Sequence, residues 1–433
     1  MAQSSRVRQN KVAAASYIGA GIITPGAGGG GLTRRLMGQG RAFGDGLAGR
    51  KSDGTVNSFN TDKGYYTPVD IPNPAPIYAG FVIAAAGSVD VPNVVEYHTV
   101  LYPQGGGTPI DFSGGLFDVA SGTVIAKPAP KAGVTIPAGF HRVRTFGKVP
   151  SGGFFYYTGR FRTNASTGHG VGEVGVDLAD KATGGTISSQ AINLPMTFLG
   201  FEGDAPAGHR TIAVAGDSNS EGIGYGATPR GIGGGILAAH LEPRPVSYIQ
   251  IGRSGAGPIA MRNGYAKIAA FLAAIGATDW WCHAGTNDYY GSNVNATSEK
   301  AVMKQLLDIV LAANPGIKTW WATMPPIAAI AGSPTPATAS NQSRLNSGTT
   351  GGYDTDDRRL VVNDWLRAGG LVGLTGYTEH ALPVQRSDDP YKWTDDSSRD
   401  GLHYYNTGVA TSGGGAVLAA LALANPLGLP AAA

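Results

Sequence analysis

The chain has 433 residues, of which 42% are hydrophobic, so it is long enough to bury a large core without disulfides or metals. Glycine is about twice as frequent as usual, with 67 residues, while charged residues make up only 15% of the chain. These values exclude a short disulfide-stapled domain, and they favour a turn-rich globular protein over a disordered one. The one cysteine, Cys282, excludes an internal disulfide and a zinc site built from several thiolates.

Residues 1–60 are rich in glycine and show no sustained period of 2 or 3.6 residues, which predicts a tail rather than a domain. Residues 1–51 contain eight Lys or Arg and one Asp, a net charge of +7 in a chain whose total is +3. A basic arm of this kind can bind nucleic acid or an anionic surface. We favour attachment to a homo-oligomer or a larger assembly, and we regard nucleic acid as the weaker alternative.

Residues 6–24 loosely resemble a secretory signal peptide, because basic residues precede an apolar stretch. No A-x-A cleavage site follows, and Gly, Tyr and Pro interrupt the apolar stretch. The sequence also contains no run of about 18 apolar residues, so a membrane-spanning helix is not expected. We therefore expect no cleavable signal. The Gly-rich, cysteine-poor composition and the basic N-terminal arm favour an extracellular or virion-associated protein.

Residues 61–205 contain short runs of β-forming residues separated by Gly and Pro, with almost no helical periodicity. Runs of this length at roughly ten-residue spacing predict an antiparallel β-sandwich or jelly roll. The runs cover residues 77–86, 94–102, 117–126, 132–146, 152–163, 172–179 and 191–200.

Residues 206–433 alternate apolar β runs with helix-length segments. Strands that are buried on both faces and alternate with helices predict a parallel sheet in a three-layer α/β/α domain. The expected strands are residues 211–216, 245–252, 278–285 and 317–325, and the clearest helices are residues 259–276 and 296–314.

Polar residues follow the predicted parallel strands at the points where these strands end. Gly216-Asp217-Ser218 follows the first strand, Ser254-Gly255 the second, and Gly285-Thr286-Asn287-Asp288 the third. Asp400-Gly401-Leu402-His403 stands just before the last helical segment. Because the carboxyl ends of parallel strands meet at one edge of a sheet, we expect these four motifs to lie close together.

The four motifs, in this order, resemble the conserved blocks of the SGNH/GDSL hydrolases. The resemblance covers residues 208–425, about half of the chain, and implies a flavodoxin-like α/β/α fold and an esterase activity. It also implies that Ser218 is the nucleophile and that Ser218, Gly255 and Asn287 supply the oxyanion hole. The long interval between Asn287 and Asp400 indicates an insertion, which we assign to residues 331–353.

The chemistry of the residue types supports these roles. A serine hydroxyl is a weak nucleophile until a base removes its proton, and the imidazole of His403 titrates in the range that suits this task. Asp400, three residues earlier, can turn back to hold the other ring nitrogen and stabilise the imidazolium. The predicted catalytic residues are therefore Ser218, Asp400 and His403.

Each motif also has an ordinary structural interpretation. Asp-Ser after a strand is a common helix N-cap, and Gly252 or Gly257 can replace Gly255 in its proposed role. Asp217 and Asp288 are expected to order their turns by hydrogen bonds to the backbone. Cys282 is expected to be a buried strand thiol, and His283 either lines the site or lies in the core.

The sequence implies no cofactor and no metal, because the other histidines have no ligand spacing and the glycine runs match no nucleotide-binding motif. Aromatic residues 65–66 and 154–157 either form a sugar-stacking platform or belong to the core. An ancillary β domain together with these hydrolase motifs resembles the carbohydrate O-acetylesterases, which implies an acylated carbohydrate or a small ester as substrate, with O-acetyl groups favoured. No long apolar lid segment is evident, which speaks against a lipase. Alternatives are a lipase, and a non-catalytic carbohydrate-binding or structural virion protein on a hydrolase scaffold.

Overall fold

The computed structural model describes much of the chain beyond residue 32, and the signal-like segment at residues 6–24 lies outside the described residues. The described ranges are residues 33–41, 50–52, 54–84, 87–157, 171–188, 198–222, 234–292, 294–344, 357–405 and 412–432. Within these ranges, no helix is long and apolar enough to cross a membrane.

The first half of the described chain forms antiparallel strands, as predicted. The longest pair joins β4 to β13 over ten residues, from Gly139 opposite Thr67 to Lys148 opposite Ser58. A facing pair of sheets, as in a sandwich, stays a prediction. The antiparallel strands are β1 (Thr33–Met37), β3 (Arg50–Lys51), β4 (Ser58–Thr67), β5 (Ile71–Pro72), β6 (Ala75–Ile77), β7 (Phe81–Ala84), β8 (Gly87–Asp90), β9 (Val95–Pro103), β10 (Ile110–Asp111), β11 (Phe117–Val119), β12 (Thr135–Ile136), β13 (Gly139–Lys148), β14 (Tyr156–Tyr157), β15 (Val171–Gly175) and β16 (Gly200–Ala205).

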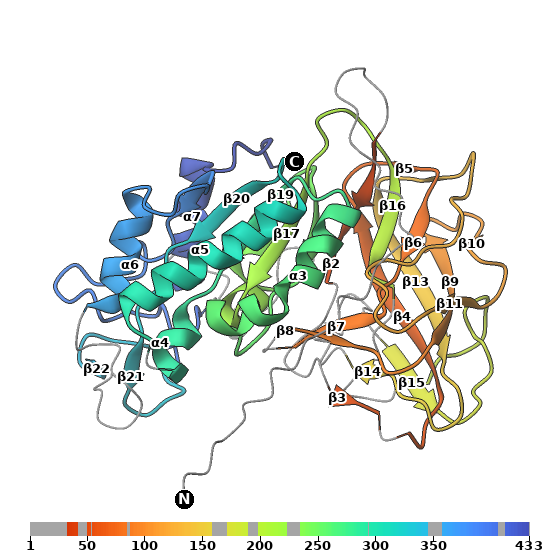
Figure 1. Ribbon diagram of the computed structural model, residues 1–433, viewed down its shortest axis with the longest axis horizontal. Coiled ribbons are helices and arrows are strands. Elements are labelled where there is room, and N and C mark those ends of the chain that lie inside the picture. Colours follow the sequence, from red (N-terminus) through yellow and green to blue (C-terminus); the bar gives the residue numbers. More distant parts are fainter. Residues whose placement is uncertain are drawn as a thin grey trace, which may run out of the picture. The chain divides into compact units, whose positions relative to one another are not determined.

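The second half contains a parallel sheet with helices on both faces (Figure 1). Its strands run in the order β18-β17-β19-β20-β23, which is the 2-1-3-4-5 order of flavodoxin-like folds. The elements are β17 (Thr211–Gly216), α1 (Ser218–Glu221), α2 (Gly235–Leu241), β18 (Ser247–Gln250), α3 (Pro258–Ala274), β19 (Asp279–His283), α4 (Thr286–Ser292), α5 (Ala296–Ala313), β20 (Lys318–Ala322), β21 (Ala328–Ile330), β22 (Gln342–Arg344), α6 (Arg358–Arg367), β23 (Gly376–Thr378) and α7 (Gly413–Ala424). The predicted α/β fold class is confirmed.

The side chains of β19 alternate between the two faces of this sheet, as the pleat of a strand requires. Trp280 and Cys282 belong to the core formed with α3 and α5, which lie over one face of the parallel strands in Figure 1. Trp281 belongs to a second core cluster formed with α2 and α7. Helices therefore cover both faces, which gives the three layers that the sequence predicts.

The tail predicted for residues 1–60 is wrong for its last part, because β1, β2 (Gln39–Arg41), β3 and the start of β4 are strands. β2 pairs in parallel with β18 and in antiparallel with β4, so it joins the two halves into one mixed sheet. Gly38 is needed here, because its φ is +104° and a Cβ would lie 2.3 Å from the hydroxyl of Tyr65. β2 has three residues next to glycines, which is too short to show the two-residue hydrophobic period by which a strand is predicted. Residues 32–433 form one compact unit, and the boundaries at 60/61 and 205/206 stay predictions.

The interval between Asn287 and Asp400 holds more regular structure than expected. The predicted insertion at residues 331–353 includes β22, which pairs with β21, and its residues 345–353 lie outside the described residues. The interval also contains α6 and β23, which the sequence analysis did not identify.

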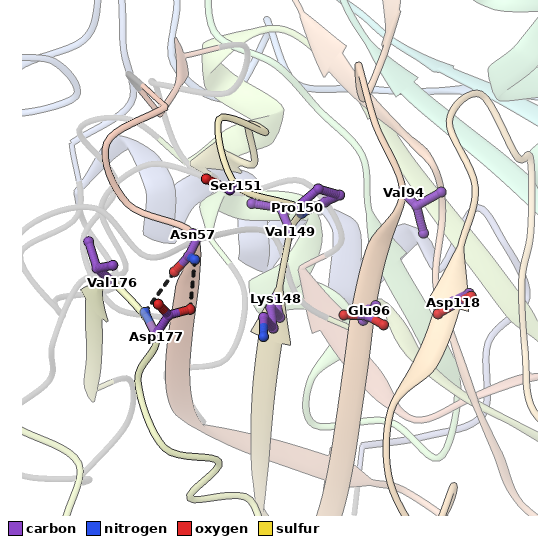
Figure 2. Close-up of a pocket in the computed structure, with 10 residues that line it drawn as sticks. All are labelled: Asn57, Val94, Glu96, Asp118, Lys148, Val149, Pro150, Ser151, Val176 and Asp177. Atoms are coloured by element: carbon purple, nitrogen blue, oxygen red, sulfur yellow. Dashed lines mark hydrogen bonds between the residues drawn. The ribbon is translucent and has the colours of Figure 1, made fainter.

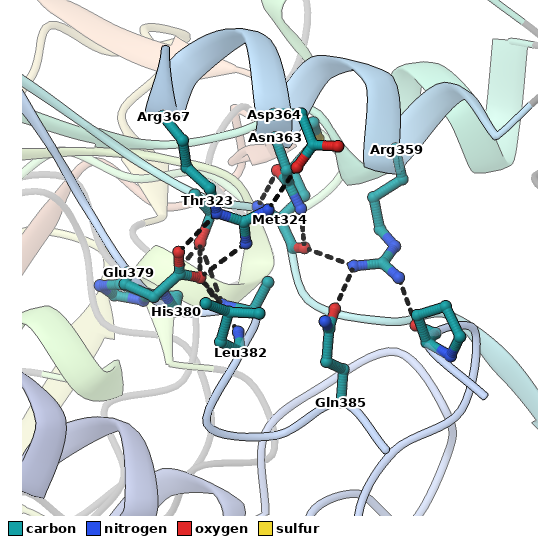
Figure 3. A network of polar contacts seen from close by, with 12 residues as sticks. Thr323, Met324, Arg359, Asn363, Asp364, Arg367, Glu379, His380, Leu382 and Gln385 are labelled. Carbon is teal, nitrogen blue, oxygen red and sulfur yellow. Dashed lines mark hydrogen bonds and ion pairs between the residues drawn. The ribbon is translucent and has the colours of Figure 1, made fainter. Parts of the chain in front are cut away.

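A polar network anchors α6 to the chain that leads toward Asp400 (Figure 3). The side-chain amide of Asn363 donates to the carbonyl of Met324 at 2.9 Å, and Arg367 pairs with Glu379 at 2.8 Å. The hydroxyl of Thr323 donates to Glu379 at 2.6 Å and accepts the N–H of His380 at 2.8 Å. The segment after β23 is thereby fixed to the end of β20.

Candidate active site

Ser218 lies at the start of α1, directly after the central strand β17. Gly216 has a φ of +128°, and a Cβ there would lie 2.0 Å from the carbonyl oxygen of His283, so the turn requires glycine. Asp217 caps α1, since its Oδ1 accepts the backbone N–H of Asn219 at 2.9 Å. This bond orders the turn, as expected for Asp217.

The structure brings Ser218, His403 and Asp400 into one hydrogen-bonded row. The Nε2 atom of His403 lies 2.8 Å from the Oγ of Ser218, and its Nδ1 lies 2.7 Å from an Oδ of Asp400. The other Oδ of Asp400 accepts the backbone N–H groups of Leu402 and His403, each at 2.9 Å. The three predicted residues therefore have the connectivity that activates a serine hydroxyl.

The turn that carries Asp400 and His403 is held from both sides. Gly401 has a φ of +77°, and a Cβ there would lie 1.8 Å from the carbonyl oxygen of Ala328. Ser398 donates to the carbonyl of His403 at 2.8 Å and accepts the N–H of Gly401 at 2.9 Å. These contacts fix the backbone conformation of the turn and therefore the position of the His403 imidazole.

Asp400 is ionised across the working range of an imidazole base. Burial acts to raise its pKa, but hydrogen bonds from the His403 side chain and from two backbone N–H groups outweigh burial and lower the pKa to about 2. A carboxylate that stays charged can orient the ring of His403 and stabilise its protonated form.

The loop after β18 contains Gly252, Gly255 and Gly257, and the structural reason for glycine differs among the three positions. A Cβ at Gly252 would lie 2.1 Å from the Oγ of Ser220, and one at Gly257 would lie 2.0 Å from an Oδ of Asp288. Gly255 instead has a φ of +77° in the turn between them. Gly252 and Gly257 are thus explained by close packing, which leaves Gly255 as the candidate for a backbone donor.

Asn287 lies beside this loop, at the start of α4. Its side-chain Nδ2 donates to the carbonyl of Ala256 at 3.0 Å, which uses one of its two N–H bonds. The loop also reaches the nucleophile turn, because the N–H of Arg253 donates to the carbonyl of Gly216 at 2.8 Å. The three motifs meet at one edge of the sheet, although no hydrogen bond between described residues joins Ser218 directly to Asn287.

Glu221, at the end of α1, contacts the loop after β18, and the sequence analysis did not identify it. Its carboxylate accepts the backbone N–H of Ser254, so α1 fixes the residue that precedes Gly255. An acidic residue three positions after Ser218 looks like a solvated helix residue in sequence. Its burial, at 2% exposure, follows only from the fold.

Asp288 and Glu299 form a buried pair of acidic residues next to Asn287, and the sequence analysis identified only Asp288. Burial, together with the nearby Asp288 carboxylate, raises the pKa of Glu299 to about 10, so Glu299 is a neutral acid beside Asp288 at neutral pH. Asp288 accepts the N–H of Ile259 at 2.8 Å, at the N-terminus of α3. Asp288 thus bonds to the backbone at the start of α3 and not within its own turn, as had been expected, and its neighbour Glu299 was not foreseen.

Other candidate residues lie in the core. Cys282 is fully buried, as predicted, and His283 is 1% exposed with its ring centroid 4.9 Å from that of His380. Burial lowers the pKa of His283 to about 3, so this ring is neutral. Of the proposed aromatic platform, Tyr65, Phe155 and Tyr156 are buried, and the side chain of Tyr157 lies outside the described part. The described residues gather no cluster of three metal-ligating side chains.

No protein-family model matches the sequence, and a comparison with curated proteins finds no match. Solved structures do match over most of the chain. A GDSL-like lipase from Bacteroides ovatus is 10% identical, with a TM-score of 0.36, over 93% of this chain and 100% of that one. A family two carbohydrate esterase from Clostridium thermocellum is 16% identical, with a TM-score of 0.32, over 92% of this chain and 100% of that one.

A third structure, a family 2 carbohydrate esterase with a carbohydrate-binding domain from Corynascus thermopiles, is 13% identical. The match covers 92% of this chain and 100% of that one, with a TM-score of 0.35. The solved structures to which this chain is similar include GDSL-like lipases, an acylhydrolase and carbohydrate esterases.

Proposed function

We propose that this protein is a serine hydrolase of carboxylic esters, with Ser218 as nucleophile, His403 as general base and acid, and Asp400 as the residue that orients His403. One observation carries the proposal: the Oγ of Ser218, both ring nitrogens of His403 and a carboxylate oxygen of Asp400 form a continuous row at 2.8 and 2.7 Å. A serine that only caps a helix bonds to a backbone N–H of the first turn and does not require a histidine and an aspartate in line with it.

In the first half-reaction, the Oγ of Ser218 attacks the ester carbonyl carbon while its proton moves to the Nε2 of His403. The tetrahedral intermediate then collapses, and His403 returns the proton to the departing alcohol. In the second half-reaction, His403 takes a proton from water, the hydroxide attacks the acyl-enzyme, and the acid leaves while the Oγ of Ser218 regains its proton. Asp400 remains a carboxylate throughout, consistent with its lowered pKa.

The oxyanion of each tetrahedral intermediate requires donors that are already in place. We assign the backbone N–H groups of Ser218 and Gly255 and the side-chain amide of Asn287 to this role. Support comes from the bond between Asn287 and the carbonyl of Ala256, which orients the amide and leaves its second N–H free to donate. A donor that needs no reorganisation stabilises the transition state more than the ground state.

The substrate that we favour is an O-acetyl ester of a carbohydrate. The turns that carry the site consist mainly of glycine and polar residues, namely residues 216–219, 252–257 and 285–288, with few apolar side chains to hold a long acyl chain. An attachment role in a virion, with residues 1–31 as the arm, rests on the charge of that segment alone, which has Arg6, Arg8 and Lys11 and no acidic residue.

Hydrolysis of a matched pair of soluble esters tests the proposal. We expect a higher kcat/KM for p-nitrophenyl acetate than for p-nitrophenyl octanoate, and acetate release from an acetylated polysaccharide. His403→Ala should remove both activities, because the serine then lacks its base. A preference for the octanoate would identify a lipase, and absence of turnover on all three substrates would favour a non-catalytic protein.

A further inference from the structure

A groove of about 490 Å³ lies in the β region, among residues that take no part in the candidate active site (Figure 2). Its volume falls in the range of sites that hold small molecules, about 300–1,000 Å³. The groove crosses the ends of three neighbouring strands, β13, β9 and β11, whose side chains line it.

Three charged side chains form a row along the groove. Lys148 on β13 stands opposite Glu96 on β9, and Glu96 stands opposite Asp118 on β11. Figure 2 shows the three side by side. None of them forms a hydrogen bond or an ion pair with any other residue of the described chain. Like charges directly opposite each other destabilise a sheet. The pairing of β9 with β11 therefore gives no reason for Glu96 and Asp118 to stand opposite each other.

The wall of the groove is rigid and partly apolar. Asn57 and Asp177 exchange two hydrogen bonds, at 2.9 Å from the amide of Asn57 and at 2.8 Å from the N–H of Asp177. The carbonyl of Asn57 also accepts the N–H of Val149 at 2.9 Å. Next to this wall, Val176 is 62% exposed and Val94 is 38% exposed, so C–H surface is available beside the charged row.

We propose that this groove binds a neutral saccharide unit of a glycan chain. Glu96 and Asp118 would accept hydrogen bonds from sugar hydroxyls, Lys148 would donate to a hydroxyl or ring oxygen, and Val94 and Val176 would contact the C–H face of the ring. The excess of carboxylates opposes an anionic ligand, and the ammonium group of Lys148 within the row opposes a metal ion.

Binding at this groove goes beyond the proposed esterase activity and does not depend on it. A polymer held here would meet the active site as a tethered substrate, which raises its effective concentration. The groove should therefore affect KM for a polysaccharide and leave hydrolysis of a small ester unchanged.

Isothermal titration calorimetry with the full chain tests the proposal, using neutral hexasaccharides of glucose, xylose, mannose and galactose and an acidic control, hexagalacturonate. We expect at least one neutral hexasaccharide to bind with a millimolar or lower Kd. Asp118→Ala and Lys148→Ala should each weaken this binding about tenfold or more. Lys131→Ala, which removes a lysine outside the groove, is the matched control and should bind normally.

Hydrolysis of p-nitrophenyl acetate by the same variants reports separately on the esterase proposal and should equal that of the wild type. The groove proposal fails if no neutral hexasaccharide binds at millimolar concentration, or if only hexagalacturonate binds. It also fails if binding persists unchanged in both groove variants, because the saccharide then occupies another site.

Discussion

The Nε2 atom of His403 lies 2.8 Å from the Oγ of Ser218, although 185 residues separate the two in the chain. Ser218 follows the central strand β17, whereas His403 lies in a turn after β23, at the edge of the parallel sheet. The polar network around Thr323 and Glu379 fixes the chain that leads to this turn (Figure 3). The candidate site therefore depends on the packing of the C-terminal segment as much as on the nucleophile turn.

Replacement of Asn287 by Ala should lower kcat on p-nitrophenyl acetate by ~10²–10³ with little change in KM, because an oxyanion donor acts mainly in the transition state. Asn263→Ala, an exposed asparagine on α3, is the control and should retain full activity. Steady-state kinetics of both variants measure the effect. A rise in KM at constant kcat would instead assign Asn287 to substrate binding.

Glu299 should act on catalysis through Asp288, without contact to the substrate. Glu299→Ala removes the buried neutral carboxyl beside Asp288 and leaves a cavity there, so we expect kcat to fall roughly tenfold, equivalent to ~1.4 kcal/mol. Glu299→Gln keeps a neutral polar side chain of the same size, and kcat should stay near the wild-type value. Equal losses of kcat in both variants would contradict this positioning role.

The same pair of variants should differ in how stability depends on pH. The pKa of Glu299 is about 10 in the folded protein and near 4.5 when unfolded, so the unfolded state binds fewer protons between these values. The wild type should then lose stability as the pH rises from 5 to 9, and Glu299→Gln should lose less. Urea unfolding at pH 5, 7 and 9 measures this dependence.

His283 should make the protein less stable in acid. Its pKa is about 3 in the folded state and about 6.5 when unfolded, so the unfolded state binds more protons in this window. Stability should fall by up to about 1.4 kcal/mol per pH unit below pH 6.5 on account of this group. His283→Gln should flatten the dependence, as measured by urea unfolding at pH 7, 6 and 5.

His98 provides a control of opposite sign. A hydrogen bond from its ring to Asp180 raises its pKa, so its contribution is present in acid and is lost as the pH rises through the raised value. His98→Gln should therefore steepen the acid loss. Identical pH dependences of the wild type and both variants would contradict the assignment of buried neutral His283.

The parallel half of the fold could be predicted because its strands are buried on both faces and read as apolar runs, for example Thr211–Gly216 and Asp279–His283. β2 could not be predicted in the same way. It has three residues, and it is held by pairing with two distant strands and by the buried side chain of Gln39, whose amide donates to the carbonyl of Val246 at 3.0 Å.

Some residues of the candidate site could likewise be predicted from the sequence, and others could not. Ser218, Asn287, Asp400 and His403 could be found because each belongs to a short motif that follows a strand or precedes a helix. Glu299 could not be found in this way, because an acidic residue in the first turn of a helix is expected on the surface. Its role follows from burial against Asp288, which is a property of how α4 and α5 pack and not of local sequence.

Removal of residues 1–31 should leave kcat/KM on p-nitrophenyl acetate within about twofold, because every contact described for the site lies after residue 31. Removal of residues 1–41 should instead prevent folding, since it deletes β1 and β2, which pair with β16, β18 and β4. Activity assays and circular dichroism of both truncations check this. Sedimentation of the first truncation tests the attachment role, with a lower sedimenting mass expected if the arm mediates assembly.

The measurement that tests the account most directly is the rate of p-nitrophenyl acetate hydrolysis by Ser218→Ala beside the wild type, with circular dichroism to establish that the variant is folded. Ser218 is the only residue to which we assign the bond to the acyl group, so kcat should fall by at least ~10³. Mass spectrometry of the wild type with a fluorophosphonate ester should likewise place one adduct on Ser218. A folded variant that keeps more than about a tenth of the wild-type kcat, or an adduct on another residue, would contradict the account.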